Sequence, residues 1–190
     1  ALFESTGAPP EAVDVVVERM GAALDVIAGG GSATEVHDQV RALIEAQIVA
    51  GQLAAKSTAT DEAAADCSQV LNDETVASHA KVLTGPWMRT FIVLNPADFL
   101  ERANCPVLAL CGEKDLQVVS RLHLPAIEAA LAKSSYPHSE VVSLPGLNHL
   151  FQACETGTVD EYAGIEETVN AAVLQRLGDW ILSLPPGGAV

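Results

Sequence analysis

The sequence predicts an α/β protein in which a helical segment precedes two parallel strands and their helices. Apolar residues recur every three or four positions in the first 83 residues, and this spacing is typical of amphipathic helices. A short apolar run between proline and glycine, residues 106–112, is typical of a strand buried on both faces. The order strand, helix, strand, helix that begins there predicts a parallel pair joined by a crossover. The 190 residues amount to one domain or a large piece of one.

The helical segment begins with two well-defined helices. The first is expected at Glu11–Ala28 and ends at a run of three glycines, and the second opens at Ser32, which has capping-box spacing with Glu35. Each has one apolar face, formed by Val13, Val16, Val17, Met20, Leu24 and Ile27 in the first and by Val36, Val40, Leu43, Ile44 and Ile48 in the second. A third, alanine-rich helix is expected from about Thr60 to Lys81. We place the end of this segment at residue 83, just before the Gly85-Pro86 break.

The second segment, residues 84–190, alternates helices with strands. The spacing of Trp87, Met88 and Phe91 predicts a short helix, and it favours packing in the core over lining an acyl pocket. Strands are then expected at Val107–Cys111 and Glu140–Leu144, and helices at Pro125–Lys133 and Val169–Leu182, the last with Trp180 in the core. Two buried parallel strands are fewer than such sheets usually contain, so we expect further strands upstream of Ala1.

The composition and the charge exclude several classes of protein. Hydrophobic residues make up 49% and charged residues 18% of the chain, which excludes a disordered protein. The formal net charge of −15 is spread over both halves, and it disfavours binding to nucleic acids and to anionic membranes. No apolar run is long enough to span a membrane, and no signal peptide is visible. These observations leave the compartment open.

The cysteines and histidines do not indicate a metal site. Cys67, Cys105, Cys111 and Cys154 form no C-x-x-C pair, and the five histidines have none of the spacings of zinc ligands. We expect four free cysteines, with a Cys111–Cys154 disulfide as the alternative. The sequence therefore predicts no metal and no cofactor.

Two polar residues follow the two predicted strands and are the candidates for chemistry. Asp115 follows the first strand, and His149 follows the second. The carboxyl ends of parallel strands lie at the same edge of a sheet, where ligands and catalytic groups gather. A carboxylate there can orient an imidazole and stabilise its protonated form, and the imidazole can act as a general base. The order Asp then His is that of the last two members of an α/β-hydrolase triad.

The stretches around these two residues resemble the C-terminal part of α/β-hydrolase-fold esterases. They are VLALCGEKDLQV, residues 107–118, and LPGLNHLFQ, residues 144–152. The similarity is to the bacterial esterases described as serine-aminopeptidase-like or dienelactone-hydrolase-like, and it extends over about residues 84–184. It implies a serine hydrolase acting on carboxylic esters, with Asp115 as the triad acid and His149 as the triad base.

The same resemblance implies a partial α/β-hydrolase fold. Residues 1–83 would be the helical cap, and residues 84–190 the C-terminal part of the core with its last two parallel strands. The family's nucleophile sits in a G-x-S-x-G elbow, and no such pattern occurs in these 190 residues. The nearest sequence, around Ser32, fails at its last position, and Ser32 is expected to be a helix N-cap. We therefore predict that the complete protein is a serine esterase and that the isolated chain does not cleave esters.

A second function, from another class, stays open at this point. The chain could be a non-catalytic, hydrolase-derived binding module whose unpaired sheet edge needs a partner, and such an edge would also favour self-association. Cys111 as a substitute nucleophile is disfavoured, because it ends a strand and lacks the elbow glycines. Glu166 and Glu167 are expected to form an exposed turn and not a glycosidase pair. The expected ligand is a small-molecule ester, and the sequence does not specify its acyl chain.

Overall fold

The computed structural model describes residues 7–57, 71–135 and 138–185. The chain divides into two compact units, one within Phe3–Leu94 and the other within Asn95–Val190. Each unit is described by itself below. The first is entirely helical in its described part, and the second contains a two-stranded parallel sheet with helices, which is compatible with a partial α/β fold.

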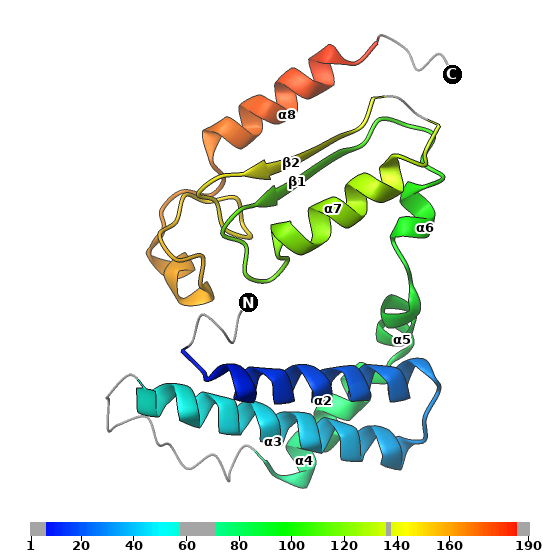
Figure 1. The fold of residues 1–190 in the computed structure, drawn as a ribbon, viewed down its shortest axis with the longest axis vertical. Helices are drawn as coiled ribbons and strands as arrows, with labels where there is room; N and C mark the ends of the chain where they lie inside the picture. The colour runs from blue at the N-terminus through cyan, green and yellow to red at the C-terminus, as the bar shows by residue number, and fades with distance from the viewer. Residues whose placement is uncertain (1–6, 58–70, 136–137, 186–190) are drawn as a thin grey trace. The chain divides into compact units, whose positions relative to one another are not determined.

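The first unit is built around a pair of long antiparallel helices (Figure 1). These are α2 (Pro10–Ala28) and α3 (Ala33–Ser57), and they confirm the two predicted helices. The third helix, α4, spans Asp73–Leu83 and is shorter than predicted, because Asn72 acts as its N-cap and accepts a hydrogen bond from Thr75 N at 2.8 Å. Residues 58–70 of the predicted third helix lie outside the described part.

Local capping explains the connection between α2 and α3. Gly30 has a φ of 74°, a left-handed conformation that favours glycine. Gly30 N donates to Ile27 O, and Gly31 N donates to Val26 O at 2.8 Å, which together form a Schellman motif. Ser32 then starts α3: its backbone N donates to Glu35 Oε2 at 2.8 Å, and Glu35 N donates to Ser32 Oγ at 3.3 Å. This reciprocal pair is the predicted capping box.

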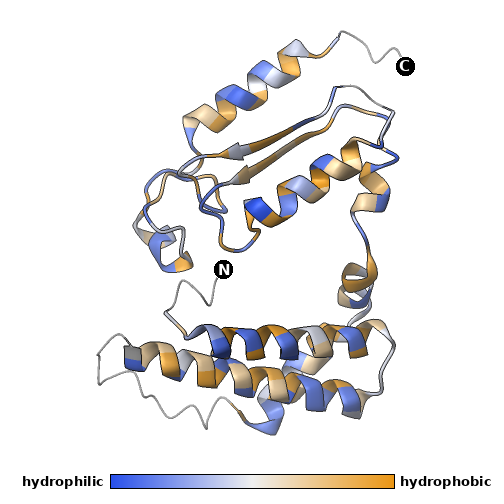
Figure 2. Cartoon of the chain, in the orientation of Figure 1, coloured by the Kyte–Doolittle hydropathy of each residue, from blue (hydrophilic) through white to orange (hydrophobic). Residues whose placement is uncertain are grey.

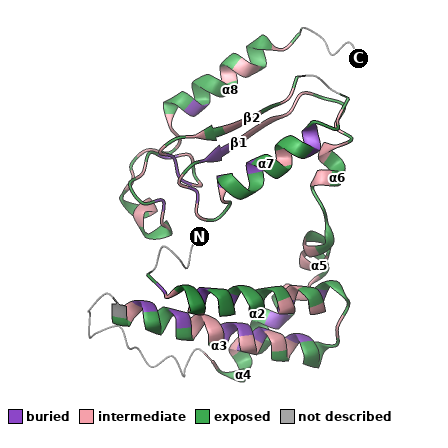
Figure 3. Ribbon diagram, viewed as in Figure 1, coloured by how far each residue is buried: buried purple, intermediate pink, exposed green. Residues whose placement is uncertain are grey.

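Two apolar clusters form the core of the helical unit. One is Ala8, Val13, Val16, Leu43, Ala50 and Ala54, and the other is Ile27, Val36, Val40, Ile44, Val76 and Ala80. Figure 3 shows buried positions along both α2 and α3. Helix α5 (Pro86–Val93) belongs to this unit, because Ile92 packs against the second cluster. The boundary between the two compact units therefore falls between Leu94 and Asn95. The sequence had placed it at residue 83.

Trp87 and Phe91 are exposed, so the prediction that they pack in the core is wrong. Trp87 is 71% exposed and Phe91 is 63% exposed. Their rings stack on one another with centroids 5.3 Å apart, because residues four apart share one face of a helix. Helical spacing placed the two rings together, but Ile92 on another face of α5 makes the core contact.

The second unit contains the parallel pair that the sequence predicted. Strand β1 spans Leu108–Gly112 and strand β2 spans Glu140–Leu144, and they run parallel in a register from Leu108↔Glu140 to Gly112↔Leu144. Both strands are rich in hydrophobic residues (Figure 2). Short helix α6 (Ala97–Leu100) precedes β1, and the 3₁₀ helix η2 (Val159–Gly164) follows β2. The parallel register brings the carboxyl ends of both strands to one edge.

Helices α7 (Ser120–Leu131) and α8 (Ala171–Ser183) flank this pair on opposite sides in the view of Figure 1. Helix α7 connects the strands and begins five residues earlier than predicted, so that Pro125 lies inside it. Helix α8 buries Val173, and its Arg176 forms an ion pair with Glu140 of β2.

Burial in the second unit is lower than the sequence predicted. Leu108, Ala109 and Leu110 of β1 are only half-buried, and Trp180 of α8 is half-buried instead of lying in the core. The reason is that the sheet has two strands in the part of the chain that the structure describes, so few side chains surround β1. No helix among the described residues is long and apolar enough to cross a membrane.

Candidate functional site

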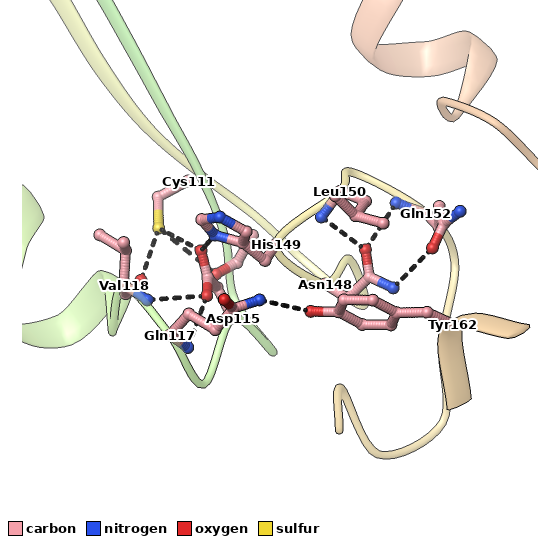
Figure 4. A network of polar contacts seen from close by, with 10 residues as sticks. Cys111, Asp115, Gln117, Val118, Asn148, His149, Leu150, Gln152 and Tyr162 are labelled. Carbon is pink, nitrogen blue, oxygen red and sulfur yellow. Dashed lines mark hydrogen bonds and ion pairs between the residues drawn. The ribbon is translucent and has the colours of Figure 1, made fainter. Parts of the chain in front are cut away.

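The candidate site lies at the carboxyl ends of β1 and β2 (Figure 4). The loop after β1 carries Asp115, and the loop after β2 carries His149. The two loops are joined by their backbones, since Glu113 N donates to Leu144 O at 2.8 Å and Lys114 N donates to Leu147 O at 3.0 Å. The structure thus brings together the two residues that the sequence selected.

Asp115 is a buried carboxylate with every oxygen engaged. Only 5% of the residue is exposed. Its Oδ1 accepts hydrogen bonds from Gln117 N and Val118 N, both at 2.8 Å, which closes a tight turn after β1. Its Oδ2 lies 2.8 Å from His149 Nδ1. The two backbone bonds hold the carboxylate in place and leave its second oxygen directed at the imidazole.

His149 has one ring nitrogen held and the other available. Its side chain is 38% exposed, whereas that of Asp115 is 5% exposed. A carboxylate can only accept a hydrogen bond, so the Nδ1 of a neutral ring carries the proton and donates it to Asp115. The Nε2 of that tautomer carries a lone pair, and no described residue forms a hydrogen bond with it. This arrangement can accept a proton at Nε2 and stabilise the resulting imidazolium through the carboxylate.

Gly112 allows the two loops to approach this closely. A Cβ at Gly112 would lie 2.5 Å from Asn148 O and closer still to Leu147 O, far inside any normal contact distance. The backbone just before His149 therefore lies directly against the end of β1. The sequence marks Gly112 only as the end of a strand, because the contact that requires glycine comes from residues about 35 positions away in the chain.

Cys111 contacts the carboxylate but is poorly suited to be a nucleophile. It is buried, and its Sγ lies 3.1 Å from Val118 O and 3.8 Å from Asp115 Oδ2. Burial raises the pKa of the Cys111 thiol, and the negative charge of Asp115 raises it further. A thiol needs to be ionised to attack a substrate, so these surroundings suppress its reactivity.

A neighbouring loop supports the site from the side of η2. Tyr162 Oη accepts a hydrogen bond from Gln117 Nε2 at 3.0 Å, which ties η2 to the turn that holds Asp115 (Figure 4). Glu161 accepts hydrogen bonds from the backbone N of residues 155–157 and from the Thr156 hydroxyl. The Thr156 hydroxyl bond and these backbone bonds lower the pKa of Glu161 to about 2. Gln117 was not singled out by the sequence, and no local signal marks its partner 45 residues away.

The structure offers no serine partner for His149 within its described residues. Ser32, the nearest approach to an elbow sequence, is an N-cap in the helical unit, and its Oγ donates to Glu35 Oε2 at 2.7 Å. Among the residues described, no three histidine, cysteine, aspartate or glutamate side chains are placed to hold a metal ion. Cys105, Cys111 and Cys154 are free thiols, and Cys67 lies outside the described ranges.

Comparison with known proteins gives no relative for this chain. No protein-family model, no curated protein and no solved structure matches it. A function can therefore be inferred only from Asp115, His149 and the residues that hold them.

Proposed function

We propose that this chain supplies the acid and the base of a Ser-His-Asp triad that hydrolyses carboxylic esters. The observation that carries the proposal is the 2.8 Å contact between His149 Nδ1 and the buried Asp115 carboxylate. It is supported by the half-exposed imidazole and by the two backbone hydrogen bonds that fix Asp115. Among the residues that the structure describes, His149 Nε2 has no hydrogen-bond partner, and a general base needs such a free nitrogen.

In the proposed reaction, His149 Nε2 removes the proton from a serine hydroxyl as its oxygen attacks the ester carbonyl. Asp115 holds the ring in the tautomer that makes Nε2 the acceptor and stabilises the imidazolium that forms. His149 then returns the proton to the departing alcohol, which leaves an acyl-serine. Water completes the cycle: His149 takes a proton from it while its oxygen attacks the acyl carbon, and the proton passes to the released serine.

The serine belongs to a segment that is not among these 190 residues, since the chain contains no G-x-S-x-G sequence. Backbone N–H groups of that segment would form the oxyanion hole, as the residue after the nucleophile does in this fold. The helical unit, within Phe3–Leu94, would serve as a cap that selects the substrate. No metal or cofactor takes part in this scheme.

A second candidate function is a non-catalytic binding module. The observation that favours it is the small sheet: in the described part of the chain, β1 and β2 pair only with one another and leave their outer edges without a strand. Such edges favour pairing with another chain. Under this reading the Asp115–His149 pair is a remnant that stabilises the loops.

The test is to determine the coding sequence upstream of Ala1 in its source and to express the complete open reading frame. The proposal expects a G-x-S-x-G sequence there, labelling of its serine by a fluorophosphonate, and hydrolysis of p-nitrophenyl esters. General acid–base groups contribute roughly 10²–10⁴-fold to the rate. His149→Ala should therefore reduce kcat by roughly 100-fold or more. Asp115→Asn should reduce kcat as well.

The control is His123→Ala, which alters an exposed histidine of α7 outside the site. It should leave kcat unchanged. An open reading frame without a serine elbow, or ester hydrolysis that His149→Ala leaves intact, would refute the catalytic proposal. The first of these outcomes would favour the binding module.

A further inference from the structure

Asn148 is the most deeply buried polar side chain of the site. Its exposed fraction is 0%, and it is among the largest side chains that the structure buries completely. It directly precedes His149 in the sequence. Burying an amide is unfavourable unless its polar atoms are hydrogen-bonded, so its partners show what the residue does.

The amide of Asn148 closes the loop that carries His149 (Figure 4). Its Oδ1 accepts hydrogen bonds from Leu150 N at 2.9 Å and from Gln152 N at 3.0 Å. Its Nδ2 donates to Gln152 Oε1 at 3.0 Å. The side chain thus binds the backbone on the far side of His149 and bridges the turn in which His149 lies.

The backbone of the same turn closes around the amide. Asn148 N donates to Gln152 O at 3.0 Å, and Phe151 N donates to Asn148 O at 3.1 Å. Phe151 has a φ of 57°, a conformation that is uncommon for a large side chain and needs support from its surroundings. A second layer supports the turn from outside, since Gln152 Nε2 donates to Glu167 O at 2.7 Å and Asn170 N donates to Phe151 O at 2.8 Å.

The position of His149 follows from this turn. The Asn148 backbone is pressed against Gly112 at the end of β1, and the Asn148 side chain fixes Leu150. The backbone is therefore held on both sides of His149, at residues 148 and 150. These constraints set the direction in which the imidazole leaves the chain, toward Asp115 Oδ2.

We propose that Asn148 is the positioning residue of the Asp115–His149 pair: its buried amide shapes the turn of residues 148–152 so that His149 Nδ1 meets Asp115 and Nε2 stays free. This inference rests on the proposed function, because it assigns Asn148 a role in presenting the catalytic base. Asn148 acts through His149 and touches no reacting atom. Its effect should therefore appear in the state of the His149 ring.

The test measures the His149 tautomer by long-range ¹H–¹⁵N correlation spectra of the ¹⁵N-labelled chain, with the His149→Gln variant used for assignment. The unmodified chain should show an Nδ1–H ring with a proton signal shifted downfield by the hydrogen bond to Asp115. Asn148→Ala should lose the downfield signal. Asn148→Asp keeps an oxygen that can accept from Leu150 N and Gln152 N, but its second oxygen faces Gln152 Oε1 where the amide donated. It should therefore destabilise the chain and still retain the signal.

Asn170→Ala is the matched control. It also removes an asparagine that caps backbone, since Asn170 Oδ1 accepts from Ala172 N at 3.0 Å. The variant also loses the bond from Asn170 Nδ2 to Glu167 Oε1. The backbone contact of residue 170 with Phe151 stays in place, so the His149 signal should persist even though the chain is destabilised. Loss of the signal in Asn170→Ala as well would mean that general loosening of the loop suffices, and it would overturn the specific role of Asn148.

The remaining outcomes also decide the question. A folded Asn148→Ala chain that keeps the downfield Nδ1–H signal overturns the inference. If Asn148→Ala does not fold, Asn148→Asp decides: a folded Asn148→Asp chain with the signal supports the inference, and one without it, or one that also fails to fold, overturns it. If the unmodified chain shows no Nδ1–H signal for His149, or if Asp115→Asn leaves that signal unchanged, the proposed function itself fails. This outcome differs from the failure of the inference about Asn148, in which only the Asn148 variants behave unexpectedly.

Discussion

Replacing Gly112 by alanine should separate the two loops of the candidate site. The added Cβ would lie 2.5 Å from Asn148 O and nearer still to Leu147 O, and both are backbone atoms that cannot rotate away. An ordinary carbon–oxygen contact is about 3.3–3.6 Å. The loop that carries His149 must therefore retreat from β1 by about 1 Å.

The cost follows from two terms. Overpacking by one methyl group in a closely packed region costs about 1–3 kcal/mol. A shift of this size also breaks the hydrogen bond from Lys114 N to Leu147 O, now 3.0 Å, which adds about 1 kcal/mol. We expect Gly112→Ala to lower the free energy of unfolding of the second unit by about 2–4 kcal/mol. The same shift takes His149 Nδ1 out of hydrogen-bonding distance of Asp115.

The assay is urea unfolding followed by the fluorescence of Trp180. Trp180 is in the second unit and Trp87 is in the first, so a Trp87→Phe background makes the signal report on the second unit alone. With a urea m-value of about 2 kcal/mol/M, the middle of the usual range, the midpoint should fall by roughly 1–2 M. The downfield Nδ1–H signal of His149 should disappear in the same variant.

The matched control is Gly178→Ala in α8. No atom lies within 4 Å of a Cβ at this position, and alanine in a helix interior is favoured over glycine by up to about 1 kcal/mol. Its midpoint should stay unchanged or rise. An unfolding midpoint of Gly112→Ala equal to that of the unmodified chain, together with an unaltered His149 signal, would refute the argument from close approach.

Three further predictions concern Asp115, Glu161 and the reactivity of the isolated chain. Asp115→Asn should cost about 1–3 kcal/mol in urea unfolding and lower the pKa of the Cys111 thiol, since the Asp115 charge raises it; an unchanged thiol titration would contradict this. Glu161 has a pKa of about 2 when folded against 4.5 ordinarily, so its stabilising effect is present above pH 4.5 and is lost as the pH falls toward 2. Glu161→Gln should therefore speed amide exchange of residues 155–157 at neutral pH and remove the pH dependence of their protection between pH 4.5 and 2. Equal exchange rates in the two chains at neutral pH would contradict this prediction. The isolated chain should give no stoichiometric burst with an activated ester; a burst abolished by His149→Ala would show that a nucleophile is present after all.

Much of the fold could be predicted because its signals are local. The periodicity of Glu11–Ala28 and the capping box at Ser32 involve residues within one or two helical turns, and the structure confirms both. The two apolar strands and their parallel pairing also followed from short stretches. The bounds of the third helix were predicted less accurately, because its sparse apolar positions did not indicate that Asn72 caps it.

Burial was predicted less well because it depends on what covers a face. The spacing of Trp87 and Phe91 correctly placed them on one side of a helix, yet that side is exposed. Likewise, β1 has the composition of a strand buried on both faces, but its residues 108–110 are half-buried in a two-stranded sheet. An apolar pattern specifies which side chains share a face, and only the neighbouring elements decide whether that face is covered.

The sequence by itself determined the two long helices, both strands, the order of the main elements and the two candidate residues, Asp115 and His149. It could do so because strand ends and turn residues are marked by a few adjacent side chains. Only the tertiary structure decided that His149 Nδ1 bonds to a carboxylate 34 residues away, that Gly112 makes room for the loop, and that Asn148 closes it. These features depend on the parallel register that brings the ends of two strands together. Local sequence patterns do not predict how closely two distant backbone segments approach.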